Sequence, residues 1–230
     1  MKPVDKDTCN EKIGELLALS HQYGSFGERI ENLTLQLLGT EYKSFPLCGS
    51  RNEKEKFVVG VDGFDCVTFV ETVLALSFAR DEKDFYSLLK HLRYENGQVH
   101  WLKRNHYMSS WITLNKKHFR TVGKKDQITC FDKTLCSLES YRQQNVSLEL
   151  IPAKLESIKK SKPKTGDVIL FGSLRDDLDY FHLGILIKKE NGLSLRHAAK
   201  SKRSVVDEKL ADFLARNEMS GVKIIRPASL

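Results

Sequence analysis

The sequence predicts an α+β domain in which helices come first and an antiparallel sheet follows. Apolar residues recur at helical spacing over residues 11–38 and again over 64–92. Short apolar runs rich in β-branched residues occupy 166–172, 182–199 and 222–227, as buried strands do. No internal repeat or low-complexity tract interrupts the 230 residues, so we expect one domain rather than several.

The first 92 residues predict four helices. Leucine and isoleucine side chains mark one apolar face on each side of "YGSFG", which separates a first helix from a second. Residues 43–63 predict a loop. "FDCVTFVETVLALS" (64–77) then predicts a largely buried helix with a wide apolar face and Asp65 as its N-cap. Another helix is expected over 82–92.

The second half predicts strands. "GDVILFG" (166–172) has the composition of a buried strand, and "HLGILIKK" (182–189) and "LSLRHAA" (193–199) predict a hairpin around "ENG". "VKIIRP" (222–227) is a further strand, preceded by a helix over "DEKLADFLARN" (207–217). Residues 94–165 are the least regular part of the sequence, and we expect an insertion there.

Composition excludes some classes of protein and leaves others open. Hydrophobic residues make up 40% and charged residues 29%, as in ordinary globular proteins, and no apolar run reaches the length of a membrane helix. The net charge of +7 suits a polyanionic partner, but its basic stretches match no nucleic-acid-binding signature. We therefore expect solvated surface there and no nucleic acid partner.

The cysteines other than Cys66 are Cys9, Cys48, Cys130 and Cys136. Four cysteines could pair in an oxidising compartment or stay reduced, and the sequence does not choose between these states. Their spacing does not match a zinc ribbon, so we expect no metal site.

Cys66 is the candidate nucleophile. The thiolate is the reactive form of cysteine, and the N–H groups and partial positive charge of a helix N-terminus favour it. His182 opens one strand of the predicted hairpin and His197 lies on the other, 15 residues later, so the two can be neighbours. That arrangement suits a base, His182, oriented by a polar partner, His197, although Asp, Asn or Gln would orient it equally well.

The motifs resemble one known family. "LLGTEY", "DGFDCVTFVETVLALS", "RNHYMSSW", "TGDVILF", "HLGILI" and "LRHAA" follow the order and approximate spacing of the NlpC/P60 superfamily of papain-like cell-wall peptidases, over residues 27–227. The Thr-Phe-Val-Glu run after the cysteine resembles its DUF1460 branch, the N-acetylmuramoyl-L-alanine amidase-like family. This resemblance implies a papain-like fold in which the nucleophile helix packs on the antiparallel sheet.

The resemblance also implies roles for individual residues. Cys66 would be the nucleophile, His182 the general base and then acid, and His197 the orienting residue. Tyr42, which follows Leu-Gly-Thr, would lie near the nucleophile and help to stabilise the oxyanion. The substrate-binding candidates are the Arg-x-His-Tyr motif and a nearby tryptophan: Arg104, His106, Tyr107 and Trp111. Glu71, by contrast, is expected to be structural.

The implied reaction is hydrolysis of the bond between N-acetylmuramic acid and L-alanine in peptidoglycan fragments, with 1,6-anhydro-muropeptides preferred and no cofactor needed. An endopeptidase that cuts the stem peptide between D-glutamate and diaminopimelate is the nearest alternative, and a muropeptide-binding protein without catalysis is another. The family favours the bacterial periplasm or envelope, whereas the charged N-terminus "MKPVDKDTCNEK" favours the cytoplasm unless a signal peptide was removed. The sequence leaves the oligomeric state open.

Overall fold

The computed structural model describes residues 6–228. Its contacts divide the chain into two compact units. The first unit contains the chain up to Arg104 together with Arg196–Asp207, and the second contains Asn105–Leu195 and the chain from Glu208 onward.

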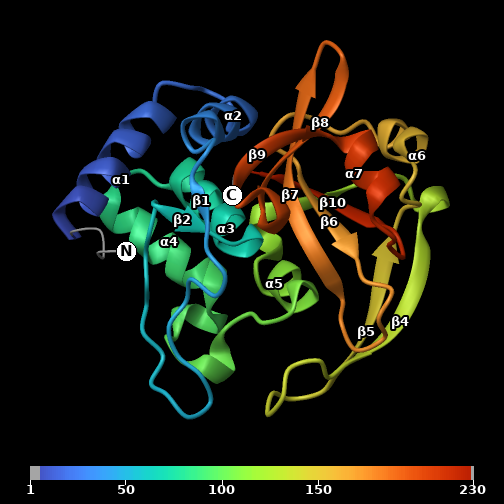
Figure 1. Cartoon of the computed structure of the whole chain (residues 1–230), viewed down its shortest axis with the longest axis horizontal. Helices are drawn as coiled ribbons and strands as arrows, with labels where there is room; N and C mark the ends of the chain where they lie inside the picture. Colours follow the sequence, from blue (N-terminus) through green and yellow to red (C-terminus); the bar gives the residue numbers. More distant parts are fainter. Residues whose placement is uncertain (1–5, 229–230) are drawn as a thin grey trace. The chain divides into compact units, whose positions relative to one another are not determined.

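Four helices build most of the first unit: α1 (Lys6–Ser20), α2 (Phe26–Gln36), α3 (Cys66–Phe78) and α4 (Glu82–Arg93). They are the blue to green helices of Figure 1, and α3 contacts the other three. Every α3 residue from Thr68 to Ser77 is buried, because its apolar side chains are met by helices on several sides. The predicted helices are confirmed.

The start of α3 is held by a capping box. The Asp65 carboxylate accepts a hydrogen bond from the backbone N–H of Thr68 at 2.7 Å, and the Thr68 hydroxyl accepts one from the N–H of Asp65 at 3.0 Å. Two N–H groups at this helix end are thereby satisfied. The prediction that Asp65 is the N-cap is confirmed.

Short strands of the first unit bring distant segments to the start of α3. β1 (Glu41–Tyr42) pairs in parallel with β2 (Gly63–Phe64), so Tyr42 lies opposite Phe64. Glu41 also pairs with Ser204 of β9 (Ser204–Lys209), which neighbours β8 (Gly192–Ala199). Both ends of the predicted loop over 43–63 are therefore anchored by strands, which the sequence analysis missed.

The helix predicted over 207–217 is wrong at its start. Asp207 belongs to β9, and α7 (Leu210–Arg216) begins three residues later. The reason is a tertiary ion pair: the Arg196 guanidinium donates to both carboxylate oxygens of Asp207, at 2.6 and 2.7 Å. This pair holds Asp207 in a strand despite the helical pattern that follows it.

The second unit is built around antiparallel strands. From β8 the order runs through β7 (Tyr180–Lys189), β6 (Val168–Gly172), β10 (Val222–Pro227) and β3 (Phe119–Val122). Side chains from β6, β10 and α7 share one apolar core with Ile158 of α6 (Leu155–Lys160). The predicted strands and hairpin are confirmed, and the chain is of mixed α+β class with mostly antiparallel pairing.

Residues 94–165 contain more regular structure than the sequence suggested. The segment holds α5 (Met108–Leu114) and β3, and β4 (Thr129–Leu135) pairs with β5 (Gln144–Leu150) in a separate antiparallel hairpin (Figure 1). Both hairpin strands alternate exposed and buried residues over part of their length, which is the pattern of a sheet covered on one face.

The cap of α3 gives a first prediction. Replacing Asp65 by Ala should lower the free energy of unfolding by about 1 kcal/mol, because the Thr68 N–H loses its acceptor. Asp65→Asn keeps a side-chain oxygen and should lose less. Urea unfolding of both variants is the measurement, with Asp81→Ala, which removes the α4 cap, as a matched control. An Asp65→Ala protein that unfolds at the wild-type midpoint would contradict the capping role.

Candidate functional site

Cys66 is the first residue of α3, directly after the N-cap. It is half-buried, and the helix N-terminus to which it belongs carries a partial positive charge that favours an anion. The local sequence explains this position, since Asp65 and Thr68 cap the helix and the apolar residues that follow bury its body. A thiol held at such a site is suited to react as a thiolate.

Tyr42 lies close enough to Cys66 for their charges to interact. Burial raises the pKa of the Tyr42 hydroxyl, and negative charge on Cys66 and then Asp65 raises it further. Tyr42 therefore remains a protonated phenol that can donate a hydrogen bond. The strand pairing of β1 with β2 is what brings the two together, because Tyr42 lies opposite Phe64, two residues before Cys66.

His197 is buried on β8 in the first unit. The preceding residue, Arg196, is also buried and donates to the Thr34 hydroxyl at 2.9 Å and to the Glu31 carbonyl at 3.1 Å, besides its ion pair with Asp207. Arg196 thus fixes this part of β8 to α2 and β9. Sequence reasoning overlooked Arg196, whose partners are distant along the chain.

His182 is half-buried on β7 in the second unit. Its ring stacks on Phe171 of β6, with centroids 6.1 Å apart, and on Phe213 of α7 at 5.5 Å. These two aromatic contacts limit the orientations open to the imidazole.

Asp179, one residue before β7, is a further residue that the sequence analysis did not single out. Asp179 is 1% exposed, and its carboxylate accepts hydrogen bonds from the backbone N–H groups of Ser109 and Tyr180, both at 2.7 Å. Ser109 lies in the first turn of α5, so Asp179 joins that turn to the strand that carries His182. Burial raises the pKa of this carboxyl, and the two backbone donors oppose the rise only in part.

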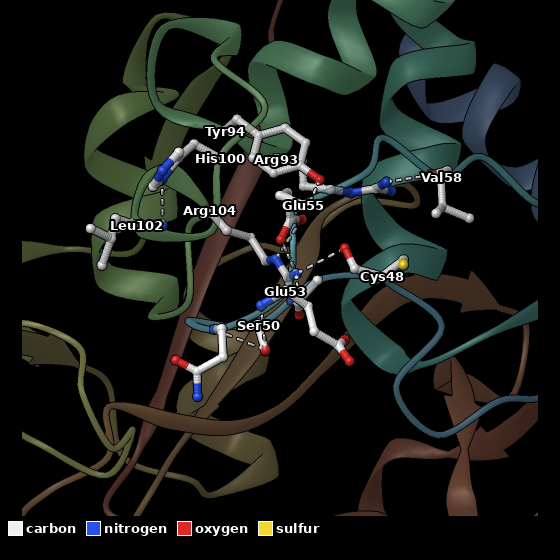
Figure 2. Close-up of polar contacts among 12 residues, drawn as sticks. Cys48, Ser50, Glu53, Glu55, Val58, Arg93, Tyr94, His100, Leu102 and Arg104 are labelled. Atoms are coloured by element: carbon white, nitrogen blue, oxygen red, sulfur yellow. Dashed lines mark hydrogen bonds and ion pairs between the residues drawn. The ribbon is translucent and has the colours of Figure 1, made fainter.

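Arg104 holds a carboxylate of the protein itself (Figure 2). Its Nε and Nη2 donate to the two oxygens of Glu55 at 3.0 and 2.5 Å, and Nη2 also donates to the Gly49 carbonyl at 3.3 Å. The Tyr94 hydroxyl donates to Glu55 at 2.7 Å, and burial with this hydrogen bond raises the pKa of Tyr94 well above its usual range. Glu55 is only 7% exposed, so this cluster is a buried anchor for the loop between β1 and β2. A substrate-binding role for Arg104 stays a prediction.

A second arginine anchors the same loop, at a point three residues after Glu55. Arg93 of α4 donates to the Glu71 carboxylate at 2.8 Å and to the Val58 carbonyl at 2.7 Å, and both ionic side chains are almost fully buried. Glu71 is therefore a structural carboxylate that reaches the loop through Arg93, which Figure 2 shows bonded to Val58.

The remaining predicted binding residues form aromatic contacts in the second unit. The His106 and Tyr107 rings pack on Tyr141, at 4.7 and 5.9 Å, and the Tyr107 hydroxyl accepts from the backbone N–H of Leu138 at 3.3 Å. Trp111 has no exposed surface and packs on Phe119 at 5.0 Å. A flat wall for substrate at Trp111 would thus require its neighbours to move.

Residues 6–228 include all five cysteines, and no disulfide joins any of them. Within the same range, no group of three or more His, Cys, Asp or Glu side chains is arranged to hold a metal ion. None of the described helices is long and apolar enough to cross a membrane.

The Glu55 cluster gives a second prediction. Arg104→Met should lower the free energy of unfolding by about 3–5 kcal/mol, because it leaves a buried carboxylate without its counterion. Adding Glu55→Gln should restore much of the loss, since a neutral amide can still accept from Tyr94. Denaturant unfolding of the wild type, both single variants and the double variant forms a complete cycle. An Arg104→Met protein as stable as the wild type would show that Arg104 is not a structural anchor.

Asp179 gives a prediction about pH. The folded protein binds the Asp179 proton more tightly than the unfolded chain, whose aspartate pKa is about 3.9. The contribution of Asp179 to stability is therefore fully present below about pH 3.9 and is lost as pH rises through the raised folded pKa.

Unfolding free energies of the wild type and Asp179→Asn, measured from pH 3.5 to 7, test this dependence. The advantage of the wild type over the variant should shrink as pH rises, because asparagine does not titrate. A difference that grows with pH would contradict the raised pKa.

Solved structures share this fold. An N-acetylmuramoyl-L-alanine amidase from Bacteroides uniformis superposes with a TM-score of 0.79 at 22% identity, over 90% of this chain and 100% of that chain. A Legionella pneumophila protein of family DUF1460 superposes with a TM-score of 0.80 at 24% identity, over 98% of this chain and 97% of its own. At such identities the likeness shows the fold. No curated protein matches the sequence.

The family is given by the sequence itself. The model of the AmiA-like family, described as N-acetylmuramoyl-L-alanine amidase-like, matches residues 32–222, which include Tyr42, Cys66, His182 and His197. That range covers most of the chain and both of its units. The chain therefore belongs to the N-acetylmuramoyl-L-alanine amidase-like family.

Proposed function

We propose that this protein is a cysteine-dependent amidase that hydrolyses the bond between N-acetylmuramic acid and L-alanine in peptidoglycan fragments. Membership of the amidase-like family supports a peptidoglycan amidase. The observation that carries the cysteine mechanism is the position of Cys66 as the first residue of a capped, buried helix, with the Tyr42 phenol beside it. A papain-like fold of the NlpC/P60 superfamily is part of this proposal.

The proposed reaction proceeds through a thioester. His182 takes the Cys66 proton, and the thiolate attacks the lactyl carbonyl carbon to form a tetrahedral intermediate. Its oxyanion is stabilised by the backbone N–H of Cys66 and the phenol of Tyr42. Collapse of the intermediate breaks the C–N bond, and His182 gives its proton to the leaving amine of L-alanine. Water, deprotonated by His182, then hydrolyses the thioester and restores the thiol.

His197 has the orienting role in this proposal. A general base is effective only in the correct tautomer and direction, which a second polar side chain fixes. The Arg196 contacts support that role, because they hold the strand segment next to His197 in place. The preferred substrates are proposed to be soluble fragments that end in 1,6-anhydro-muramic acid.

Product masses test the reaction. The wild type should release the intact tetrapeptide from purified anhydro-muramyl tetrapeptide, and Cys66→Ala should lose at least about 10³-fold in kcat. His182→Ala and His197→Ala should each lose about 10²–10⁴-fold, the range of a general acid–base contribution. Cys130→Ala, which removes an exposed thiol on β4, is the matched control and should be fully active.

The other outcomes separate the competing functions. A dipeptide left on the sugar would identify a stem-peptide endopeptidase instead. Binding without cleavage, unchanged in Cys66→Ala, would identify a muropeptide-binding protein. Activity abolished by EDTA would contradict the cysteine mechanism, because the proposed steps need no metal ion.

A further inference from the structure

Phe45 is an exposed aromatic residue in the segment that follows β1. Its side chain is 93% exposed, far more than any other large hydrophobic residue in the described part of the chain. A single exposed apolar side chain is ordinary on a protein surface. A phenylalanine with almost no packing contributes little to folding, however, so its position needs a separate explanation.

The backbone at Phe45 is also unfavourable. Its φ is +56°, in the left-handed region that suits glycine or asparagine and disfavours bulky side chains. Five non-glycine residues in the described range have positive φ, and Phe45 is the only aromatic one among them. The chain therefore holds an exposed ring on a strained backbone, a combination that is concentrated at functional sites.

The base of the segment is held by polar contacts although the ring is not packed. The backbone N–H of Lys43 donates to the Phe64 carbonyl at 2.9 Å, and its ammonium group forms an ion pair with Asp62 at 2.5 Å. Residues on both sides of Phe45, namely Lys43, Pro46 and Leu47, line a hollow of about 130 Å³ against Thr68 and Thr72 of α3. The flanking residues thus form part of a wall, and the phenyl ring faces solvent.

This segment begins beside the candidate nucleophile. Tyr42, whose hydroxyl pKa is raised by negative charge on Cys66, is three residues before Phe45. A chain of three residues spans at most about 11 Å, so the ring lies within that distance plus a side-chain length of Tyr42. The lactyl group joins the scissile carbonyl directly to the muramyl sugar, so in a muropeptide bound with its amide at Cys66 the sugar ring lies only a few bonds from the nucleophile, inside the range that the chain allows for Phe45.

We propose that Phe45 is a specificity-determining residue that packs its ring on the apolar C–H face of the muramyl sugar. This inference rests on the proposed function, since it assigns a part of the same substrate. A phenyl ring has no polar atom and cannot hydrogen-bond to the carboxylates of the stem peptide, whereas its flat apolar face complements the C–H face of a pyranose ring. Docking the sugar would cover the ring that the free protein leaves exposed.

Two substrates that share one scissile bond test the proposal. The first is anhydro-muramyl tetrapeptide, and the second is the lactyl-tetrapeptide, which keeps the same amide but lacks the sugar ring. Phe45→Ala should raise KM for the first about tenfold, the loss expected for one aromatic contact. It should leave turnover of the second unchanged. Phe45→Trp should keep wild-type KM, and Leu35→Ala, which removes an exposed apolar side chain on α2, should change neither substrate.

A stability measurement distinguishes binding from packing. Phe45→Asn should unfold at or above the wild-type temperature, because asparagine tolerates positive φ and little packing is lost. Its KM for the sugar-containing substrate should rise as that of Phe45→Ala does. A Phe45→Asn protein that is clearly less stable than the wild type would assign Phe45 to the fold and overturn the proposal.

Binding without catalysis separates this inference from the proposed function. Calorimetric titration of anhydro-muramyl tetrapeptide into Cys66→Ala should give an affinity that falls about tenfold when Phe45→Ala is added. If the wild type cuts neither substrate but this affinity difference is present, the proposed function fails and the Phe45 site stands. Equal affinities in both proteins, or no binding to either, would overturn the Phe45 site.

Discussion

The buried carboxylate of Glu71 is the constraint around which the helix that begins at Cys66 is arranged. A carboxylate placed in an apolar helix bundle is stable only when it is paired, and Arg93 supplies the pair from α4. The same guanidinium binds the Val58 carbonyl, so one interaction ties α3, α4 and the loop before Cys66 together. The cost of burying the two charges is offset by fixing three segments at once.

Arg104 and Glu55 repeat this arrangement at the other part of the loop. Together the two arginines turn a stretch with little regular secondary structure into a defined support, and β1 and β2 close its ends. Tyr42 and Cys66 therefore lie near each other because of contacts made well away from either side chain. Phe45 belongs to the same loop. Because the neighbouring residues are held in place, Phe45 can keep its unfavourable backbone conformation.

Local signals in the sequence were enough for the four helices of the first unit and for the cap of α3. Periodicity marks α1 to α4, and the Asp65 cap is encoded within three residues of it. The two-residue strands β1 and β2 carry no periodicity, and Asp207 was misassigned because its partner lies on another strand. The sequence identified Arg104 as a residue able to bind a carboxylate, but its partner Glu55 is 49 residues away along the chain. Asp179 likewise accepts from an N–H group that is 70 residues away. Pairings of that kind depend on the folded topology.

The cysteines have a consequence for chemical labelling. Cys48, Cys130 and Cys136 are exposed thiols, whereas Cys66 and Cys9 are partly buried. An alkylating probe aimed at Cys66 will therefore meet three accessible competitors, and their oxidation can cross-link molecules in an ageing sample. A background in which these three are serine leaves two partly shielded thiols. Burial raises the pKa of Cys9, which lowers the fraction of reactive thiolate at that site at neutral pH.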